Sequence, residues 1–223
     1  MKEYNIAIDG PSGAGKSTVA KLLAKKLGIM YLDTGALYRT VGLKAKRDGW
    51  KEDNALVSDL LSATDIRAEF SGGRQRMYLD GEDVTDAIRL GDVSDYGSRF
   101  SALPCVRVAL LGLQRRIAAE NTSVLDGRDI GTCVLPNAEY KFYLTASVEE
   151  RARRRYEELR AKGEDVDLDR VKADIAARDK RDMTREISPL RKADDAVEIN
   201  SDNMTAEEVA ERMISFVKNG RST

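Results

Sequence analysis

Residues 8–18 read IDGPSGAGKST, and this stretch decides the fold. Gly10, Gly15, Lys16 and Ser17 match the spacing G-x-x-x-x-G-K-[ST] of a phosphate-binding loop. Glycines let backbone N–H groups converge on phosphate oxygens, while the lysine reaches the β and γ phosphates and the serine offers a hydroxyl to Mg²⁺. An apolar run precedes the loop and a helical pattern follows it, which disfavours a plain turn between strand and helix. The stretch therefore predicts a nucleoside triphosphate site.

The bulk composition excludes several classes of protein. The chain of 223 residues has 37 Lys and Arg against 38 Asp and Glu, so its net charge of -1 predicts neither a nucleic-acid nor a membrane partner. Cys105 and Cys133 fit no metal-ligand or disulfide spacing, and the sequence has no apolar run of membrane-spanning length. We therefore expect a cytoplasmic monomer. Histidine is absent, so the commonest general base is not available.

The order of apolar runs predicts an α/β fold. Residues 4–9, 29–32, 123–125, 140–144 and 196–199 read as strands, separated by helical patterns. This alternation predicts a doubly wound parallel sheet of about five strands with helices on both faces. From Asp65 the apolar residues recur at every second position, with turn residues at 71–74 and 80–81. This pattern predicts a small inserted antiparallel β meander.

Two motifs follow expected strands at the edge where a parallel sheet binds its ligands. Residues 33–39 read DTGALYR, and residues 126–129 read DGRD. Asp126 is placed to help hold Mg²⁺, and Arg128 to meet an anion. Arg39 either joins this site or lies in solvent, and the motif alone leaves both readings open.

An unusual stripe of charge lies near the end of a predicted helix. Val171 and Ile175 are apolar, and the same helical face continues in the stretch RDKRDMTR with Arg178, Arg181, Asp182 and Arg185. A face directed at a core does not normally carry unpaired guanidinium groups, because burying unpaired charge is costly. The stripe indicates an anion site, unless the end of the helix emerges into solvent.

A second arginine cluster lies in the stretch RARRR at residues 151–155. Arg151, Arg154 and Arg155 share one helical face and are candidates for a lid over the nucleotide, with a solvated surface as the alternative. Two groups of arginines opposite one triphosphate loop suit an acceptor that is itself anionic. A phosphate acceptor is largely ionised at neutral pH, since its second pKa is about 6, and needs no general base.

Taken together, the motifs GPSGAGKST, DTGALYR, DGRD and RDKRDMTR resemble those of the bacterial cytidylate kinases, in order and at similar separations across nearly the whole chain. The resemblance implies phosphoryl transfer from ATP to CMP or dCMP with Mg²⁺. The motifs themselves predict that Ser17 and Asp126 hold the metal, and we expect catalytic roles for Lys16, Arg128, Arg181 and Arg185. The resemblance assigns ATP binding to Gly10, Pro11, Ser12, Gly13, Ala14, Gly15, Lys16, Ser17 and Thr18, with the lid residues Arg151, Arg154 and Arg155. It assigns CMP binding to Thr34, Tyr38, Arg39, Ser98, Arg107, Arg128, Asp129, Arg178, Asp182 and Arg185.

The resemblance also implies how one kinase domain is divided. The core comprises about 1–33, 105–148 and 166–223, the monophosphate-binding insertion about 34–104, and the lid about 149–165. A kinase for another nucleoside monophosphate or for a small hydroxyl metabolite is the alternative activity, and the latter would need a carboxylate base. A switch GTPase is disfavoured because no N-K-x-D stretch is present.

Overall fold

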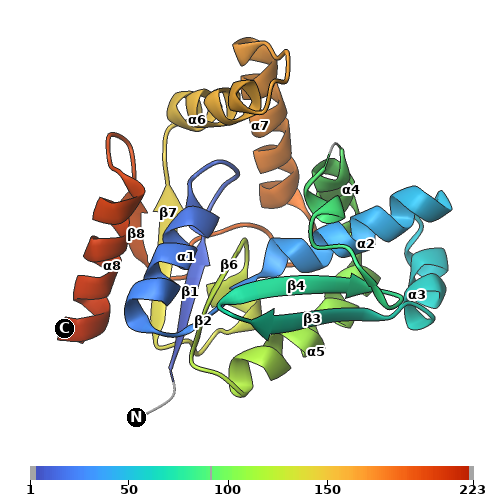
Figure 1. The fold of residues 1–223 in the computed structure, drawn as a ribbon, viewed down its shortest axis with the longest axis horizontal. Coiled ribbons are helices and arrows are strands. Elements are labelled where there is room, and N and C mark those ends of the chain that lie inside the picture. Colours follow the sequence, from blue (N-terminus) through green and yellow to red (C-terminus); the bar gives the residue numbers. More distant parts are fainter. Residues whose placement is uncertain (1–3, 91, 221–223) are drawn as a thin grey trace.

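The central element of the computed structural model, which describes residues 4–90 and 92–220, is a parallel sheet with the strand order β2-β6-β1-β7-β8 (Figure 1). Every adjacent pair in this sheet runs parallel. Its strands are β1 (Asn5–Asp9), β2 (Met30–Asp33), β6 (Ser123–Gly127), β7 (Tyr140–Thr145) and β8 (Val197–Asn200). The predicted five-stranded parallel sheet is confirmed, with each strand within two residues of its expected bounds.

Side chains alternate between the two faces of the sheet, as a strand period of two requires. Ile6 and Ile8 of β1 pack in one core with α1 (Lys16–Leu27) and α8 (Ala206–Asn219). Ala7 points into the opposite core, which α5 (Pro104–Ala119) and the π-helical turn η2 (Ile130–Val134) cover. Helices therefore cover both faces, as the doubly wound fold predicts.

A small antiparallel sheet interrupts the alternation of strands and helices, as the change of period predicts. It has the order β3-β4-β5, with β3 (Ile66–Ser71), β4 (Arg74–Leu79) and β5 (Glu82–Asp83). A separate apolar core joins it to the surrounding helices. These helices are α2 (Thr34–Asp48), α3 (Asn54–Ser62), η1 (Ala87–Arg89) and α4 (Val93–Phe100).

Two further helices lie above the carboxyl ends of the parallel strands (Figure 1). These helices, α6 (Val148–Ala161) and α7 (Leu168–Thr184), share a small core of their own built around Ala152, Val171 and Ile175. The lower end of α7 approaches α4, so the two helices flank the edge where the loops after β1, β2 and β6 meet. The division into core, insertion and lid stays a prediction. Within the described chain, no helix is both long and apolar enough to cross a membrane.

Candidate active site

The loop between β1 and α1 has the backbone that a phosphate cradle requires. Gly13 and Gly15 have φ angles of 77° and 87°, in the left-handed region that favours glycine. A Cβ atom on Gly10 would lie 1.9 Å from the carbonyl oxygen of Leu144, so any other residue would push the loop away from β7. The glycine spacing in the sequence therefore follows from close packing as well as from phosphate binding.

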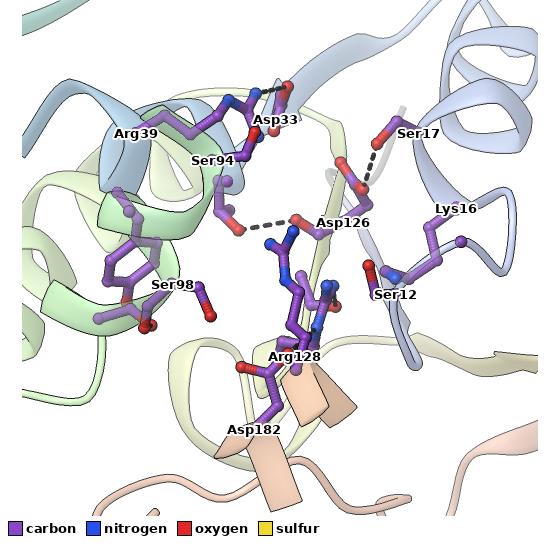
Figure 2. A pocket seen from close by; sticks show the side chains of 18 of the residues that line it. Ser12, Lys16, Ser17, Asp33, Arg39, Ser94, Ser98, Asp126, Arg128 and Asp182 are labelled. Atoms are coloured by element: carbon purple, nitrogen blue, oxygen red, sulfur yellow. Dashed lines mark hydrogen bonds and ion pairs between the residues drawn. The ribbon is translucent and has the colours of Figure 1, made fainter. Parts of the chain in front are cut away.

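Lys16 and Ser17 open α1 and face the cavity from the donor side (Figure 2). The Lys16 ammonium is buried and donates to the carbonyl oxygen of Pro11 at 2.7 Å. Burial and the neighbouring charge of Arg128 lower the pKa of Lys16 well below its usual value. An anion bound between these two side chains would remove that repulsion, so the electrostatics favour phosphate.

The residues expected to hold Mg²⁺ lie together, Ser17 in the first turn of α1 and Asp126 near the carboxyl end of β6. The Ser17 hydroxyl donates to Oδ2 of Asp126 at 2.9 Å, and the Tyr31 hydroxyl donates to Oδ1 of the same carboxylate at 2.8 Å. An octahedral ion with Mg–O distances of about 2.1 Å places neighbouring ligand oxygens about 3 Å apart. The separation of the Ser17 and Asp126 oxygens therefore fits two adjacent ligand positions of such an ion.

A buried ion pair supports the donor loop from behind, and sequence analysis missed one of its members. Asp179 of α7 accepts from the backbone N–H of Ser12 at 3.0 Å and pairs with Arg151 of α6. Arg151 also donates to the Ser12 carbonyl oxygen at 2.9 Å. Asp179 lies four residues after Ile175, on the buried face of α7, and that spacing was the available signal. Arg151 is buried and does not line the cavity, so its assignment to ATP binding stays a prediction.

The side of the cavity opposite Lys16 and Ser17 is lined by guanidinium groups that carboxylates hold in place. Arg39 pairs with Asp33 at 2.7 Å, and Nε of Arg128 donates to Asp182 at 2.8 Å (Figure 2). Figure 2 shows Arg39 across the cavity from Lys16 and Ser17, with Arg128 between the two sides. These contacts bring together α2, the loop after β6, and α7.

Asp129 lies between two further arginines. Its carboxylate pairs with Arg107 of α5 and accepts from Nη2 of Arg185 at 3.3 Å. The Arg107 guanidinium also lies over the Tyr38 ring, 5.4 Å from its centroid. This residue is nearly inaccessible to solvent, yet it lines the cavity, so it offers a buried carboxylate to a bound ligand.

Several buried polar atoms around the cavity have no hydrogen-bond partner within the described chain. One is the hydroxyl of Ser98, and three are Nε atoms of arginines: Arg39, Arg107 and Arg178. Burial, with the charge of Arg128 next, also lowers the pKa of Arg178 to about 10. Unsatisfied buried donors are costly, so their grouping indicates that a polar, anionic ligand completes the site.

The cavity that these residues share has a volume of about 510 Å³. The predicted residues that line it are Ser12, Gly13, Gly15, Lys16, Ser17, Thr18, Thr34, Tyr38, Arg39, Ser98, Arg107, Asp126, Arg128, Asp129, Arg154, Arg155, Arg178, Asp182 and Arg185. Those that do not line it are Gly10, Pro11, Ala14, Arg151 and Arg181. Ser94 and Ser101 also line the cavity, and no motif in the sequence singles them out.

Arg181 differs from its neighbours on the predicted charged stripe. Its side chain is 45% exposed and pairs with Asp95 of α4 at 2.8 Å. The buried face of α7 instead runs through Val171, Ile175, Asp179 and Asp182. The catalytic role assigned to Arg181 stays a prediction.

The loop, the parallel sheet and the facing cationic site are typical of P-loop proteins that transfer phosphoryl groups. The fold is similar to that of an uncharacterized protein from Eubacterium ventriosum, with a TM-score of 0.54 and 13% identity over 98% of this chain and 100% of that one. It is also similar to shikimate kinase from Bacteroides thetaiotaomicron, with a TM-score of 0.50 and 13% identity over 97% and 99% of the two chains. These likenesses concern the fold alone.

Sequence comparison defines the family more narrowly. The cytidylate kinase family model matches residues 6–219. The chain is 53% identical over 214 residues to a cytidylate kinase from Geobacter sulfurreducens, covering 96% of this chain and 92% of the relative. It is 50% identical over 217 residues to a cytidylate kinase from Caldicellulosiruptor bescii, covering 97% and 96%. The chain belongs to the cytidylate kinase family, which confirms the resemblance inferred from its four motifs.

Proposed function

We propose that this protein transfers the γ-phosphoryl group of ATP to CMP or dCMP, giving ADP and CDP or dCDP. The observation that carries the proposal is that one cavity holds both a phosphate-binding loop and a second cationic site, formed by Arg39, Arg128, Arg178 and Arg185. A hydrolytic switch needs only the first of these sites. Membership of the cytidylate kinase family supports the same activity.

The transfer needs no general base from the protein. An ionised oxygen of the acceptor phosphate attacks the γ phosphorus, and the bond to the oxygen that bridges the β and γ phosphates breaks. That bridging oxygen leaves with the electron pair as part of ADP. Lys16 and Arg128, which face each other in the cavity, stabilise the charge that spreads over the transferred group.

Asp129 is the residue best placed to select the acceptor base. It is buried between Arg107 and Arg185, and it lines the same cavity as the Ser98 hydroxyl, which has no hydrogen-bond partner among the described residues. A carboxylate accepts from the exocyclic amine of cytosine, whereas uracil offers a carbonyl oxygen at the same position. Arg178 and Asp182 would bind the sugar, and Thr34 and Tyr38 would complete the acceptor pocket.

Ser17 and Asp126 would hold Mg²⁺, and the ion when bound would neutralise charge on the β and γ phosphates. The Ser17 hydroxyl and the Asp126 carboxylate are already in contact, so they are positioned as neighbouring ligands. Asp126 is in turn oriented by the Tyr31 hydroxyl. This second contact fixes the direction of the carboxylate.

Two arginines of α6 face the donor side of the cavity and would form the lid over ATP. Arg154 donates to the backbone carbonyl oxygen of Ser201 at 2.7 Å, and Arg155 pairs with Glu158 at 2.7 Å. Both can exchange these contacts for phosphate contacts when ATP binds. That the protein is monomeric and lies in the cytoplasm also remains a prediction. The free thiols of Cys105 and Cys133 are compatible with a reducing compartment.

An acceptor screen tests the proposed function. Purified protein with ATP and Mg²⁺ is assayed for ADP release and for phosphorylated product with CMP, dCMP, UMP, AMP and GMP. CMP and dCMP are expected to be the best acceptors by kcat/KM. Equal rates with all five, or ADP release without a phosphorylated product, would contradict the proposal.

A further inference from the structure

The edge strand of the parallel sheet is completed at its end by a side chain of the inserted meander. Among the described strands, β2 has a neighbour on one side only, where Asp33 lies opposite Asp126. On the other side, Oε1 of Gln75 accepts from the Asp33 N–H at 2.8 Å, and Nε2 of Gln75 donates to the Asp33 carbonyl oxygen at 3.2 Å. One amide group thus satisfies both outward backbone groups of Asp33, as a neighbouring strand would.

The residue that Gln75 holds is the one that orients an acceptor arginine. Oδ1 of Asp33 accepts from the N–H of Ala36 at 3.0 Å and so caps α2. Oδ2 of Asp33 pairs with Arg39 at 2.7 Å (Figure 2). Gly35 permits this arrangement, since a Cβ atom there would lie 2.9 Å from Nη1 of Arg39. The position of the Arg39 guanidinium therefore depends on the position of the Asp33 backbone.

The contact between Gln75 and Asp33 is not needed to attach the meander to the rest of the molecule. Ala68 and Phe70 of β3 pack against the core that contains Leu32. Met77 and Leu79 of β4 are buried in the core shared with α2. Apolar burial supplies most of the attachment, so the amide of Gln75 can act on geometry without determining whether the meander folds.

From these contacts we infer that Gln75 is a positioning residue for the acceptor phosphate. It acts through the backbone of Asp33 and then through the carboxylate of Asp33, which directs Arg39 toward the phosphate. The inserted meander thereby contributes to phosphate binding without touching the substrate. The inference rests on the proposed function, because Arg39 matters in this way only if the acceptor is a phosphate.

The test is a steady-state comparison of Gln75→Met with the wild-type protein. Methionine keeps the length of the side chain but removes both hydrogen bonds to Asp33. We expect the KM for CMP to rise about 10-fold, because small displacements of binding groups are costly. The KM for ATP should change less than about 2-fold, because the donor loop does not contact Gln75. The matched control is Arg76→Met, since Arg76 is the next residue of β4 and is exposed, and it should leave both constants unchanged.

A double substitution separates positioning from a general structural role. In an Arg39→Ala background, adding Gln75→Met should change the KM for CMP less than about 2-fold, because two residues that act through one contact are not additive. A full effect in that background, or equal rises in both KM values, would overturn the inference. Unfolding of both Gln75→Met and Gln75→Glu would also overturn it, since the amide would then be needed for folding. If the wild-type protein does not phosphorylate CMP, the proposed function fails; if it does and Gln75→Met is unchanged, only this inference fails.

Discussion

On the proposed donor side, Lys16 and Ser17 belong to one continuous segment, the loop after β1 and the first turn of α1. The proposed acceptor arginines come instead from α2, α5, the loop after β6, and α7. The donor loop obtains its shape from local glycines and from the N-terminus of one helix. The acceptor site obtains its shape from ion pairs that join residues far apart in the chain, such as Arg128 with Asp182. We therefore expect substitutions on the two sides to affect the two substrates separately.

The largest expected effect comes from the donor lysine. Lys16→Met removes the positive charge closest to the transferred group, and kcat should fall about 10³-fold while the protein remains folded. Measurement of kcat at saturating ATP and CMP checks the prediction. Lys21→Met, an exposed lysine of the same helix, is the control. A loss of less than about tenfold would show that the acceptor arginines, rather than the donor loop, supply most of the stabilisation.

The second prediction concerns Asp9, which connects the two sides. It ends β1, just before the donor loop, and its carboxylate accepts from the N–H groups of Ile130 and Gly131 at 2.8 and 2.7 Å, directly after Asp129. Burial raises the pKa of Asp9 from 3.8 to about 6, despite those two hydrogen bonds. Between about pH 4 and 6, the Asp9 carboxyl is therefore mostly protonated in the folded state and mostly ionised in the unfolded state.

The sign of the pH effect follows from that difference. The stabilising contribution of protonated Asp9 is complete below about pH 4 and is lost as the pH rises through about 6, a change of about 3 kcal/mol. Asp9→Asn cannot titrate, so the difference in unfolding free energy between wild type and variant should shift by most of that amount, about 2.4 kcal/mol, between pH 4 and 7. Urea unfolding at each pH measures it. A constant difference across this range would mean that Asp9 is already ionised at pH 4.

On the acceptor side, Asp129→Asn should alter selection of the base. The amide can no longer accept as strongly from the cytosine amine, and kcat/KM for CMP should fall about 10²-fold relative to that for UMP. The KM for ATP should stay within about 2-fold of the wild-type value, because Asp129 contacts Arg107 and Arg185 rather than the donor loop. Asp194→Asn, at an exposed position, serves as the control. If the variant loses affinity for ATP as much as it loses selectivity for CMP, Asp129 does not have a separate role in binding the acceptor.

The smallest predicted effect concerns Asp179, on the donor side. Asp179→Asn keeps an oxygen for the Ser12 N–H but leaves the buried guanidinium of Arg151 without its charge partner. We expect the KM for ATP to rise about 10-fold and the KM for CMP to stay constant, because the change displaces the donor loop only. Asp174→Asn, an exposed position on the same helix, is the matched control. A larger change for CMP than for ATP would contradict a separate donor side.

What could be predicted from the sequence follows the same division. The spacing of Gly10, Gly15, Lys16 and Ser17 predicts the donor loop, because neighbouring residues make it and its context is one strand and one helix. The shared helical face predicts Arg151 among the lid residues over ATP. The structure places its side chain against Asp179, and its role in ATP binding stays a prediction. A helical face shows which residues point in one direction, but it does not show whether solvent or another helix lies there.

The sequence by itself determined the parallel sheet, the inserted meander, the donor loop and, through the combination of four motifs, the family. These features depend on local periodicity, on turn residues and on short spacings, all of which can be read along the chain. Only the tertiary structure decided that Gln75 holds Asp33, that Asp179 supports the donor loop, and that Asp129 lies between two arginines. Each of those contacts joins segments far apart in sequence, and each depends on how helices and sheets pack, which no local pattern records.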